Sequence, residues 1–316
     1  MKLLLKLITN PKIFQRTLGL SLEQFELLIT RMVPVWNQAE KCRKDRADRE
    51  RKIGGGRSYK CETLGEMVVI VLLYYKTYMT QEFVGILVDL NQGNVSRLLK
   101  KMLPLIEKAA DPELATYLAQ AKAAFDKIPS DQRINSWGDF LKKHPDLREA
   151  STDATEQRCH RSDDYETQKR HYSGKKKHHS LKTQMTVSET GRVLDISKTV
   201  PGSVHDKKLA DQEGTVEKIP EKTVQRMDSA YQGMVAEHPN HYIVLPHKKP
   251  RGEALSPLAK EMNRVNSKRR VIVENVLSRL KKFRICSGLY RGSIDDYNAV
   301  FRNVAALINF KLATPA

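Results

Sequence analysis

Apolar residues in the first hundred positions recur every three to four residues, which is the period of helices that bury one face. The pattern predicts three helices, over 63–78, over 81–89 and from Gln92 to about Lys108. On the short helix we expect Phe83, Val84 and Leu87 to face inward, and Asn91 has the side chain of an N-cap for the helix after it. This half of the chain is therefore expected to be helical.

The second and third of these helices have the pattern of a helix-turn-helix over about 80–108. Apolar anchors are expected at Val84, Leu90, Val95 and Leu98. An ordinary helical hairpin inside a core fits the same pattern, so this alternative stays open. If the two helices form a helix-turn-helix, DNA would contact the start of the longer helix. Gln92, Asn94 and Arg97 would then contact base edges, and Lys100 and Lys101 would contact phosphates.

The pattern changes near residue 145, where short alternating runs appear between glycines and prolines. Strands are expected over 147–153, in a hairpin turning at Gly191, in TVQRMD ending at Asp228, and over 241–246. A helix over 205–212, with Ser203 as N-cap, follows the hairpin, and a closing helix covers 271–283. This order predicts a ribonuclease H-like mixed sheet flanked by helices.

Together these elements predict a two-domain protein that combines an all-α part with an α/β or α+β part. The expected parts are an all-α domain with the helix-turn-helix over 1–110, a connector over 111–145 and the mixed-sheet domain over 146–316. Four cysteines without a C-x-x-C pair indicate neither a zinc site nor a disulfide framework. The start MKLLLKLITN has a lysine in its apolar stretch and no small-residue cleavage site, so no secretory signal is expected.

Charge indicates the partner. Lys and Arg number 55 against 37 Asp and Glu, a net charge of +18, which favours a polyanion. The polyanion could be an anionic membrane or a nucleic acid. The sequence contains no basic amphipathic helix with aromatic anchors for a membrane surface. Its longest apolar run, 67–75, is too short to span a bilayer. Double-stranded DNA is therefore the expected partner. The basic run 41–60 is either a second arm for phosphates or a solvated loop.

Three acids occupy notable positions in the predicted sheet: Asp153 on its first strand, Asp228 after its fourth and Glu274 on the closing helix. For Glu274 the simpler explanation is a surface pair with Arg270, worth about 0.2–0.5 kcal/mol. If the first and fourth strands are neighbours, however, the three carboxylates converge and repel one another unless a cation lies between them. Hard oxygen ligands select Mg²⁺ or Mn²⁺, and two such ions about 4 Å apart would catalyse displacement at phosphorus.

Five stretches resemble the DDE-type insertion-sequence transposases of the bacterial group called insertion sequence five. They are STDATE, HYSGKKKHHSLKTQ, VPGSVHDKKL, MDSAYQG and RRVIVENVLSRLKKFRI. The resemblance implies that Asp153, Asp228 and Glu274 are the catalytic, metal-binding triad. The family's spacing of an Arg, the Glu and a Lys is met by Arg270, Glu274 and Lys281, which would hold DNA phosphates, whereas Ser267 stands where the family has a tyrosine.

The resemblance further implies an enzyme that binds the terminal inverted repeats of its element, cuts the DNA ends and joins them to target DNA. Such an enzyme would use two Mg²⁺ or Mn²⁺ ions, act as a homodimer on paired ends and work at the nucleoid in the bacterial cytoplasm. Further phosphate contacts are expected from His205 and from the lysines 175–177, namely Lys175, Lys176 and Lys177, although a packed histidine and a solvated basic hairpin fit as well. The rival function is a catalytically silent, domesticated transposase that acts as a DNA-binding repressor; a non-transposing nuclease or an RNA-directed ribonuclease H comes third.

Overall fold

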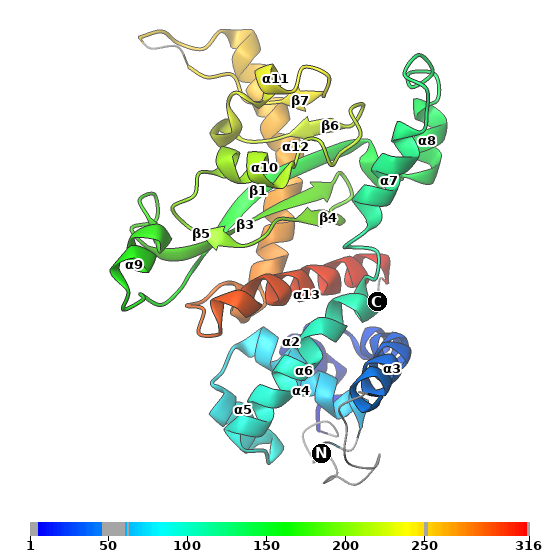
Figure 1. The fold of residues 1–316 in the computed structure, drawn as a ribbon, viewed down its shortest axis with the longest axis vertical. Coiled ribbons are helices and arrows are strands. Elements are labelled where there is room, and N and C mark those ends of the chain that lie inside the picture. The colour runs from blue at the N-terminus through cyan, green and yellow to red at the C-terminus, as the bar shows by residue number, and fades with distance from the viewer. Residues whose placement is uncertain (1–5, 46–60, 62, 250–251, 315–316) are drawn as a thin grey trace. The chain divides into compact units, whose positions relative to one another are not determined.

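The computed structural model describes residues 6–45, 61, 63–249 and 252–314 (Figure 1). The chain forms two compact units, the first made of Met1–Pro112, Lys281–Ser287 and Ala299–Ala316, the second of Glu113–Leu280 and Gly288–Asn298. Of the basic run 41–60, residues 46–60 lie outside the described residues. None of the helices in the described ranges is long and apolar enough to cross a membrane.

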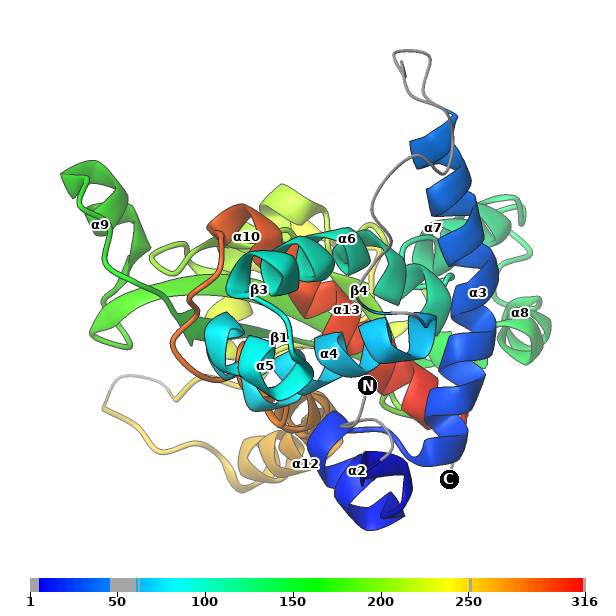
Figure 2. The same ribbon diagram turned by 90° about the horizontal axis from the view of Figure 1, so that it is seen from below.

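The first unit consists of helices (Figure 2). They are α2 (Pro11–Leu18), α3 (Leu22–Lys44), α4 (Leu64–Thr77), α5 (Gln81–Val88), α6 (Gln92–Ala110), the 3₁₀ turn η3 (Arg284–Cys286) and most of α13 (Ile294–Ala313). Helix α4 is buried from Glu66 to Tyr75, so it is the centre of this unit, and it confirms the predicted apolar helix.

The end of the chain packs with these helices. On α13, the amide of Asn303 donates to Leu103 O (2.9 Å) and to the hydroxyl of Tyr75 (3.1 Å). Beside it, Arg302 forms a two-pronged ion pair with Glu107 of α6, at 2.9 and 2.6 Å. The sequence pattern placed these C-terminal residues in the sheet domain, but their polar contacts are with helices of the first unit.

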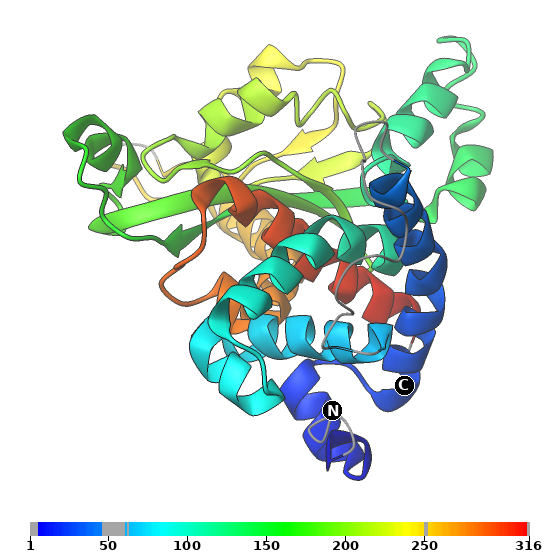
Figure 3. The ribbon, with the colours of Figure 1, turned by 60° about the horizontal axis from the view of Figure 1, so that its bottom comes forward.

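Helices α5 and α6 are joined by a tight turn in which Asp89 has a positive φ of 55° (Figure 3). Asn91 caps α6 as expected, its side chain accepting the N–H of Asn94 at 2.8 Å. The predicted inward face of α5 is wrong in part: Val84 is buried, but Phe83 and Leu87 are 48% and 40% exposed. The face against the turn is formed instead by Gly85, whose lack of a side chain lets Leu90 O come within 2.4 Å of where a Cβ would lie.

The second unit contains the sheet. Its strands are β1 (Glu149–Arg158), β2 (Tyr172–Ser173), β3 (His178–Ser188), β4 (Val193–Ile196), β5 (Val200–Pro201), β6 (Val224–Arg226) and β7 (Ile243–Val244). The order is β2-β3-β1-β6-β7, with β4 and β5 also paired to β3. Strand β1 runs antiparallel to β3 and parallel to β6, which confirms that the first strand neighbours the one before Asp228.

Helices accompany this sheet. They are α7 (Tyr117–Asp126), α8 (Trp137–Lys143), the turn η1 (Pro145–Leu147), α9 (Tyr165–His171), α10 (Asp206–Glu213), the turn η2 (Ser229–Tyr231), α11 (Met234–Glu237) and α12 (Pro257–Lys281). The expected connector contributes α7 and α8. Phe125 and Phe140, from these two helices, are buried in one hydrophobic cluster with Ala150 and Leu194 of the sheet.

Several predicted boundaries were wrong, and some elements were missed. Strand β1 continues to Arg158, so Asp153 lies in the middle of the strand rather than near its end. His205, not Ser203, is the N-cap of α10. Helix α12 begins at Pro257, well before the predicted start at residue 271. The basic loop between the first two long strands contains α9 and β2, which the sequence pattern did not reveal.

Candidate active site on β1, β6 and α12

Asp153 and Asp228 are brought together by the register of two parallel strands. Ser151 of β1 is paired with Arg226 of β6, and each aspartate lies two residues beyond its member of that pair. Neighbouring strands are about 4.8 Å apart. The N–H of Ala230 donates to Asp228 at 2.7 Å and fixes this carboxylate at the start of η2.

Asp153 is largely buried, near two further aspartates and an arginine. Burial first, and then the neighbouring charges of Asp228 and Asp206, raise the pKa of Asp153 to about 6, although the N–H of Ala154 and the charge of Arg270 act to lower it. Burial thus outweighs the compensation that Arg270 provides to this acid. A cation between Asp153 and Asp228 would favour the charged forms of both carboxylates.

Helix α12 contributes the third predicted acid. Arg270 donates a hydrogen bond of 3.4 Å to Glu274 one turn further on, so the surface pair considered from the sequence does exist. The arginine side chain is only 14% exposed, whereas that of Glu274 is 56% exposed. On the adjoining face, Val273, Val276, Leu277 and Leu280 are buried as the spacing predicted.

An ion-pair network fixes α12 against the two strands. Arg226 of β6 donates to both carboxylate oxygens of Glu149 on β1, at 2.9 and 3.2 Å. Its remaining nitrogen donates to the buried Asn266 of α12 at 3.1 Å, and Arg269 of the same helix also pairs with Glu149. These contacts hold the helix that carries Arg270 and Glu274 next to the strands that carry the aspartates.

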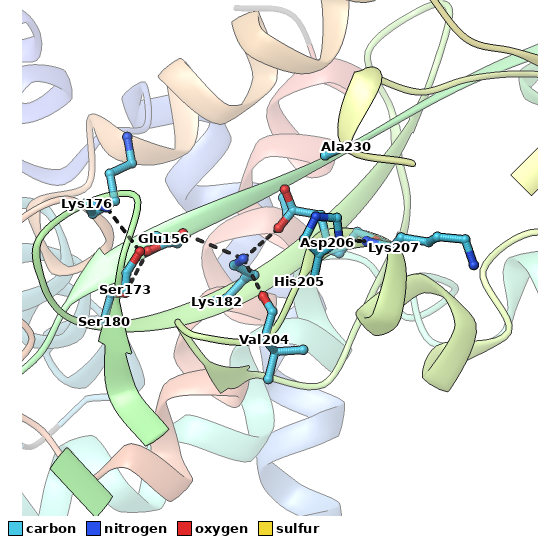
Figure 4. A network of polar contacts seen from close by, with 12 residues as sticks. Glu156, Ser173, Lys176, Ser180, Lys182, Val204, His205, Asp206, Lys207 and Ala230 are labelled. Carbon is cyan, nitrogen blue, oxygen red and sulfur yellow. Dashed lines mark hydrogen bonds and ion pairs between the residues drawn. The ribbon is translucent and has the colours of Figure 1, made fainter. Parts of the chain in front are cut away.

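Sequence reasoning missed a second set of charges beside this pair (Figure 4). Lys182 of β3 is buried, forms ion pairs with Asp206 (2.6 Å) and Glu156 (3.6 Å), and donates to Val204 O at 2.5 Å. Each of the three charged residues lies in one of the stretches that carry the family resemblance, STDATE, HHSLKTQ and VPGSVHD. That coincidence was the available signal, but spacing along the chain could not show that the three side chains meet.

The positions of the ligand atoms decide which side chains could hold a metal ion together. Among the described residues, one group of three His, Cys, Asp or Glu side chains has its ligand atoms within 4.8 Å of one another, namely Asp211, Glu237 and His238. Lys207 forms ion pairs with Asp211 (3.0 Å) and Glu237 (2.6 Å), so its ammonium already balances the negative charge of this group. Asp153, Asp228 and Glu274 are less tightly grouped, but they offer only carboxylate oxygens, which suit Mg²⁺ or Mn²⁺.

Comparison with known proteins identifies the family. A family model described as DDE superfamily endonuclease matches residues 152–309, half of the 316 residues. The chain belongs to this family. It is also 28% identical, over 272 residues, to a protein of Microchaete diplosiphon named probable transposase for insertion sequence element IS702. That match covers 86% of this chain and 88% of the relative. No solved structure matches the chain.

Both findings confirm the resemblance to DDE-type insertion-sequence transposases, and this DDE endonuclease is accordingly an enzyme of the nuclease and transposase kind. The matched residues include β1 from residue 152 onward, β6 and all of α12, so the aspartate pair and Glu274 fall within the family model.

The predicted phosphate-binding residues of the DDE endonuclease differ in their surroundings. The three lysines Lys175, Lys176 and Lys177 are exposed on the turn between β2 and β3, where Lys177 has a positive φ of 57°. His205 is exposed, and its Nδ1 accepts the N–H of Lys207 at 3.3 Å. Lys281 is exposed at the last position of α12.

The predicted recognition residues lie at the start of α6. Gln92, Arg97 and Lys100 are exposed and Asn94 is half-buried, with Arg97 donating to Asn94 at 2.7 Å. Lys101 differs from them, because its ammonium pairs with Glu40 of α3 at 2.5 Å and lies 4.2 Å from the ring centre of Trp36. Lys100 is thus better placed than Lys101 to meet a partner.

Proposed function

We propose that this chain is a transposase that cuts the DNA ends of its own element and joins them to target DNA. The observation that carries the proposal is the Asp153–Asp228 pair across the parallel strands β1 and β6, in a chain that belongs to the DDE endonucleases. Glu274 on α12, which is fixed to these strands through Arg226 and Glu149, is the proposed third acid.

The sheet supports a ribonuclease H-like catalytic domain. Three antiparallel strands in the spatial order β4-β3-β1 are followed by two parallel strands, β6 and β7, as that fold requires. We infer a division of labour close to the one expected from the sequence, with a helical DNA-binding domain over 1–110, a connector over 111–145 and the catalytic domain over 146–316. It differs in that the connector from residue 113 on belongs to the unit of the sheet, whereas residues 281–287 and 299–316 belong to the helical unit.

The proposed chemistry uses Mg²⁺ or Mn²⁺ held by Asp153, Asp228 and Glu274. Two such ions, when bound, activate a water molecule or a 3′-hydroxyl and stabilise the leaving oxygen of an in-line displacement. Asp153 lies on strand β1, Asp228 at the N-cap of η2 two residues after β6, and Glu274 on helix α12. Arg270 offsets part of the negative charge, and Arg270, Lys281, His205 and the lysines 175–177 are the proposed contacts to DNA phosphates.

DNA recognition is assigned to α5 and α6 as a helix-turn-helix. The Asn91 cap, the positive φ of Asp89 and the close approach of Leu90 to Gly85 give the tight turn that such a motif needs. Gln92, Asn94 and Arg97 would read base edges of the terminal inverted repeats. Because two DNA ends must be held at once, we propose that the enzyme acts as a homodimer.

Metal-dependent cleavage of a duplex that carries the element's terminal repeat tests this function. We expect wild-type protein to nick the repeat end with Mg²⁺ or Mn²⁺, and Glu274→Gln to bind the same duplex without cutting it. Glu261→Gln is the matched control, because Glu261 lies on the same helix and pairs with exposed Arg264 at 2.7 Å. Wild-type protein that binds the repeat but never cuts it would instead favour a DNA-binding repressor.

A further inference from the structure

The chain leaves β7 at the edge of the sheet that carries Asp228. Strands β6 and β7 are parallel, with Arg226 paired to Val244. Asp228 and Pro246 each lie two residues beyond that pair, and neighbouring strands are about 4.8 Å apart. The three residues after Pro246 form a segment that we call the β7 tail, made of His247, Lys248 and Lys249. The β7 tail therefore begins at the same sheet edge as the second proposed acid.

Side chains from two other places hold the start of the β7 tail. Asn263 of α12 accepts the N–H of His247 at 2.8 Å and donates to the carbonyl oxygen of the same residue at 3.0 Å. Gln232, in the loop after Asp228, donates to Pro246 O at 3.2 Å. The two-way bond to Asn263 satisfies both backbone groups of His247, as a neighbouring strand would. The position of an exposed segment is thus fixed by side chains.

Asn263 lies on the face of α12 that carries Glu274. The two residues are 11 positions apart, close to three helical turns, so their side chains project in nearly the same direction. Along the helix axis this separation is about 16 Å. A DNA strand advances about 3.4 Å per phosphate. A strand whose scissile phosphate lies at the three acids therefore reaches the level of Asn263 within about five nucleotides.

The β7 tail is basic and open to solvent. His247, Lys248 and Lys249 are all exposed, and neither lysine forms an ion pair with any residue in the described part of the chain. Other exposed lysines of the second unit are paired, as Lys142 is with Asp139 at 2.8 Å. Two unpaired ammonium groups on a fixed backbone are suited to contact DNA phosphates.

We propose that Lys248 and Lys249 bind phosphates of the DNA strand that lies across the three acids, and that Asn263 is the positioning residue that holds the β7 tail for this contact. This inference rests on the proposed function. It extends the phosphate contacts to a segment outside the five stretches that carry the family resemblance.

Lys142 and Lys143 provide a matched control. They too are neighbouring exposed lysines of the second unit, and replacing both by glutamine removes the same charge. Their helix, α8, packs through Phe140 in a cluster with Ala150, at the start of β1. The proposed site and the β7 tail lie instead toward the carboxyl ends of the parallel strands.

The test is binding of the full chain to a duplex that carries the element's terminal repeat and the DNA flanking it. Affinity is measured over a range of salt concentrations, in Ca²⁺ instead of Mg²⁺ so that binding is separated from cleavage. Lys248→Gln/Lys249→Gln should lower the slope of log K against log salt by about 1.8, because two phosphate contacts are lost. Lys142→Gln/Lys143→Gln should leave the slope nearly unchanged.

Neutral methylphosphonates identify the contacted phosphates. One methylphosphonate at a time replaces each phosphate within about five nucleotides of the scissile position. At a contacted phosphate, this change should weaken wild-type binding about tenfold. It should cost Lys248→Gln/Lys249→Gln nothing further, because the contact is already gone, whereas Lys142→Gln/Lys143→Gln should respond as wild type does.

Asn263→Ala tests the positioning role. Without the bond to α12, the variant should lose the same methylphosphonate penalties although both lysines remain. Combined with Lys248→Gln/Lys249→Gln, Asn263→Ala should not weaken binding further, while its loss of thermal stability should still add. A residue that only stabilises the fold would not show this dependence on the two lysines.

Penalties that vanish at the same phosphates in the lysine variant and in Asn263→Ala support the inference. Their loss in the lysine variant alone overturns the role of Asn263. A lysine variant with the salt slope and methylphosphonate pattern of wild type overturns the whole inference, and leaves the proposed function intact when wild type cuts the repeat end with Mg²⁺. A wild-type protein that neither binds nor cuts the repeat overturns the proposed function, and the inference with it.

Discussion

Arg270 and Glu274 form a hydrogen bond of 3.4 Å on α12, yet the arginine is 14% exposed and the glutamate 56%. The arginine therefore belongs to the interior of the proposed site, where its charge acts on Asp153, and the glutamate lies at the rim. A purely superficial helix pair would expose both side chains. The simple explanation of Glu274 as a partner of Arg270 and its proposed role as a metal ligand are thus compatible.

Replacing Arg270 should cost more stability than replacing an ordinary helix arginine. We expect Arg270→Gln to destabilise the fold by about 1.5–3 kcal/mol, because it removes a charge-assisted hydrogen bond and a cation beside buried acids. Arg264→Gln is the control, since Arg264 pairs with Glu261 on the same helix but both side chains are more than half exposed. That change should leave the stability almost unchanged, because solvent screens the exposed pair. Urea unfolding of the two variants at pH 7 measures the difference, and equal losses would contradict the interior role of Arg270.

Asp153 should make the fold less stable as the pH rises. Its pKa is about 6 in the folded chain against an ordinary value of 3.8, so the folded state binds this proton more tightly than the unfolded state does. The stability gained from the proton is complete below pH 3.8 and is lost as the pH rises through about 6. The variant Asp153→Asn has no carboxyl to deprotonate and so keeps this stability at high pH. Its melting temperature at pH 8 should lie on the order of a few degrees above that of wild type.

Thermal melts without metal at pH 4 and pH 8 check this sign. The gain of Asp153→Asn should disappear at pH 4, where the wild-type carboxyl is largely protonated. Adding Mn²⁺ at pH 8 should raise the melting temperature of wild type more than that of the variant, because a ligand stabilises the state it binds. A variant less stable than wild type at pH 8 without metal would contradict the raised pKa.

Lys100 and Lys101 should behave differently although they are neighbours on α6. Lys100 is exposed, and its replacement by Gln should lower the slope of log K against log salt for repeat binding by about 0.9 if it meets one phosphate. Lys101 and Arg43 hold the pKa of Glu40 at about 2 even though burial acts to raise it. Lys101→Gln should therefore lower the melting temperature and leave the salt slope nearly unchanged. Identical salt slopes in the two variants would show that the ion pair with Glu40 does not decide which lysine meets DNA.

Local patterns predicted elements well where one face is continuously apolar. The helix around Val69 and the buried stripe of α12 from Val273 to Leu280 followed directly from residue spacing. The first half of α12 did not, because Leu258, Met262 and Val265 have helical spacing but are 71%, 50% and 44% exposed among basic residues. Because these apolar residues do not form a buried face, the sequence pattern did not predict that the helix begins at Pro257.

The charged cluster around Lys182 could not be predicted from spacing at all. An alternating strand such as SLKTQMTV suggests that its lysine faces water. The residue is buried instead because Glu156 and Asp206, from β1 and α10, approach it from elsewhere in the chain. By contrast, the two aspartates followed from strand order, since a single parallel pairing between β1 and β6 is enough to bring them together.

Gly85 should be the least replaceable glycine of the helical unit, because the α5–α6 turn depends on it. A Cβ there would lie 2.4 Å from Leu90 O, a backbone atom that cannot move without opening the turn. We expect Gly85→Ala to cost about 1–3 kcal/mol and to weaken repeat binding in parallel. Gly93→Ala is the control, since its Cβ would meet nothing closer than 3.7 Å and alanine favours the helix by about 0.5–1 kcal/mol.

Chemical unfolding and repeat binding of the Gly85 and Gly93 variants can be compared side by side. If α5 and α6 form the proposed helix-turn-helix, Gly85→Ala loses repeat binding at temperatures where most of the protein is still folded, because the turn that orients Gln92 and Arg97 has opened. If they form only a hairpin in a core, Gly85→Ala loses stability but its folded fraction binds the repeat as wild type does. The ratio of binding to folded fraction therefore separates the two interpretations that the sequence left open.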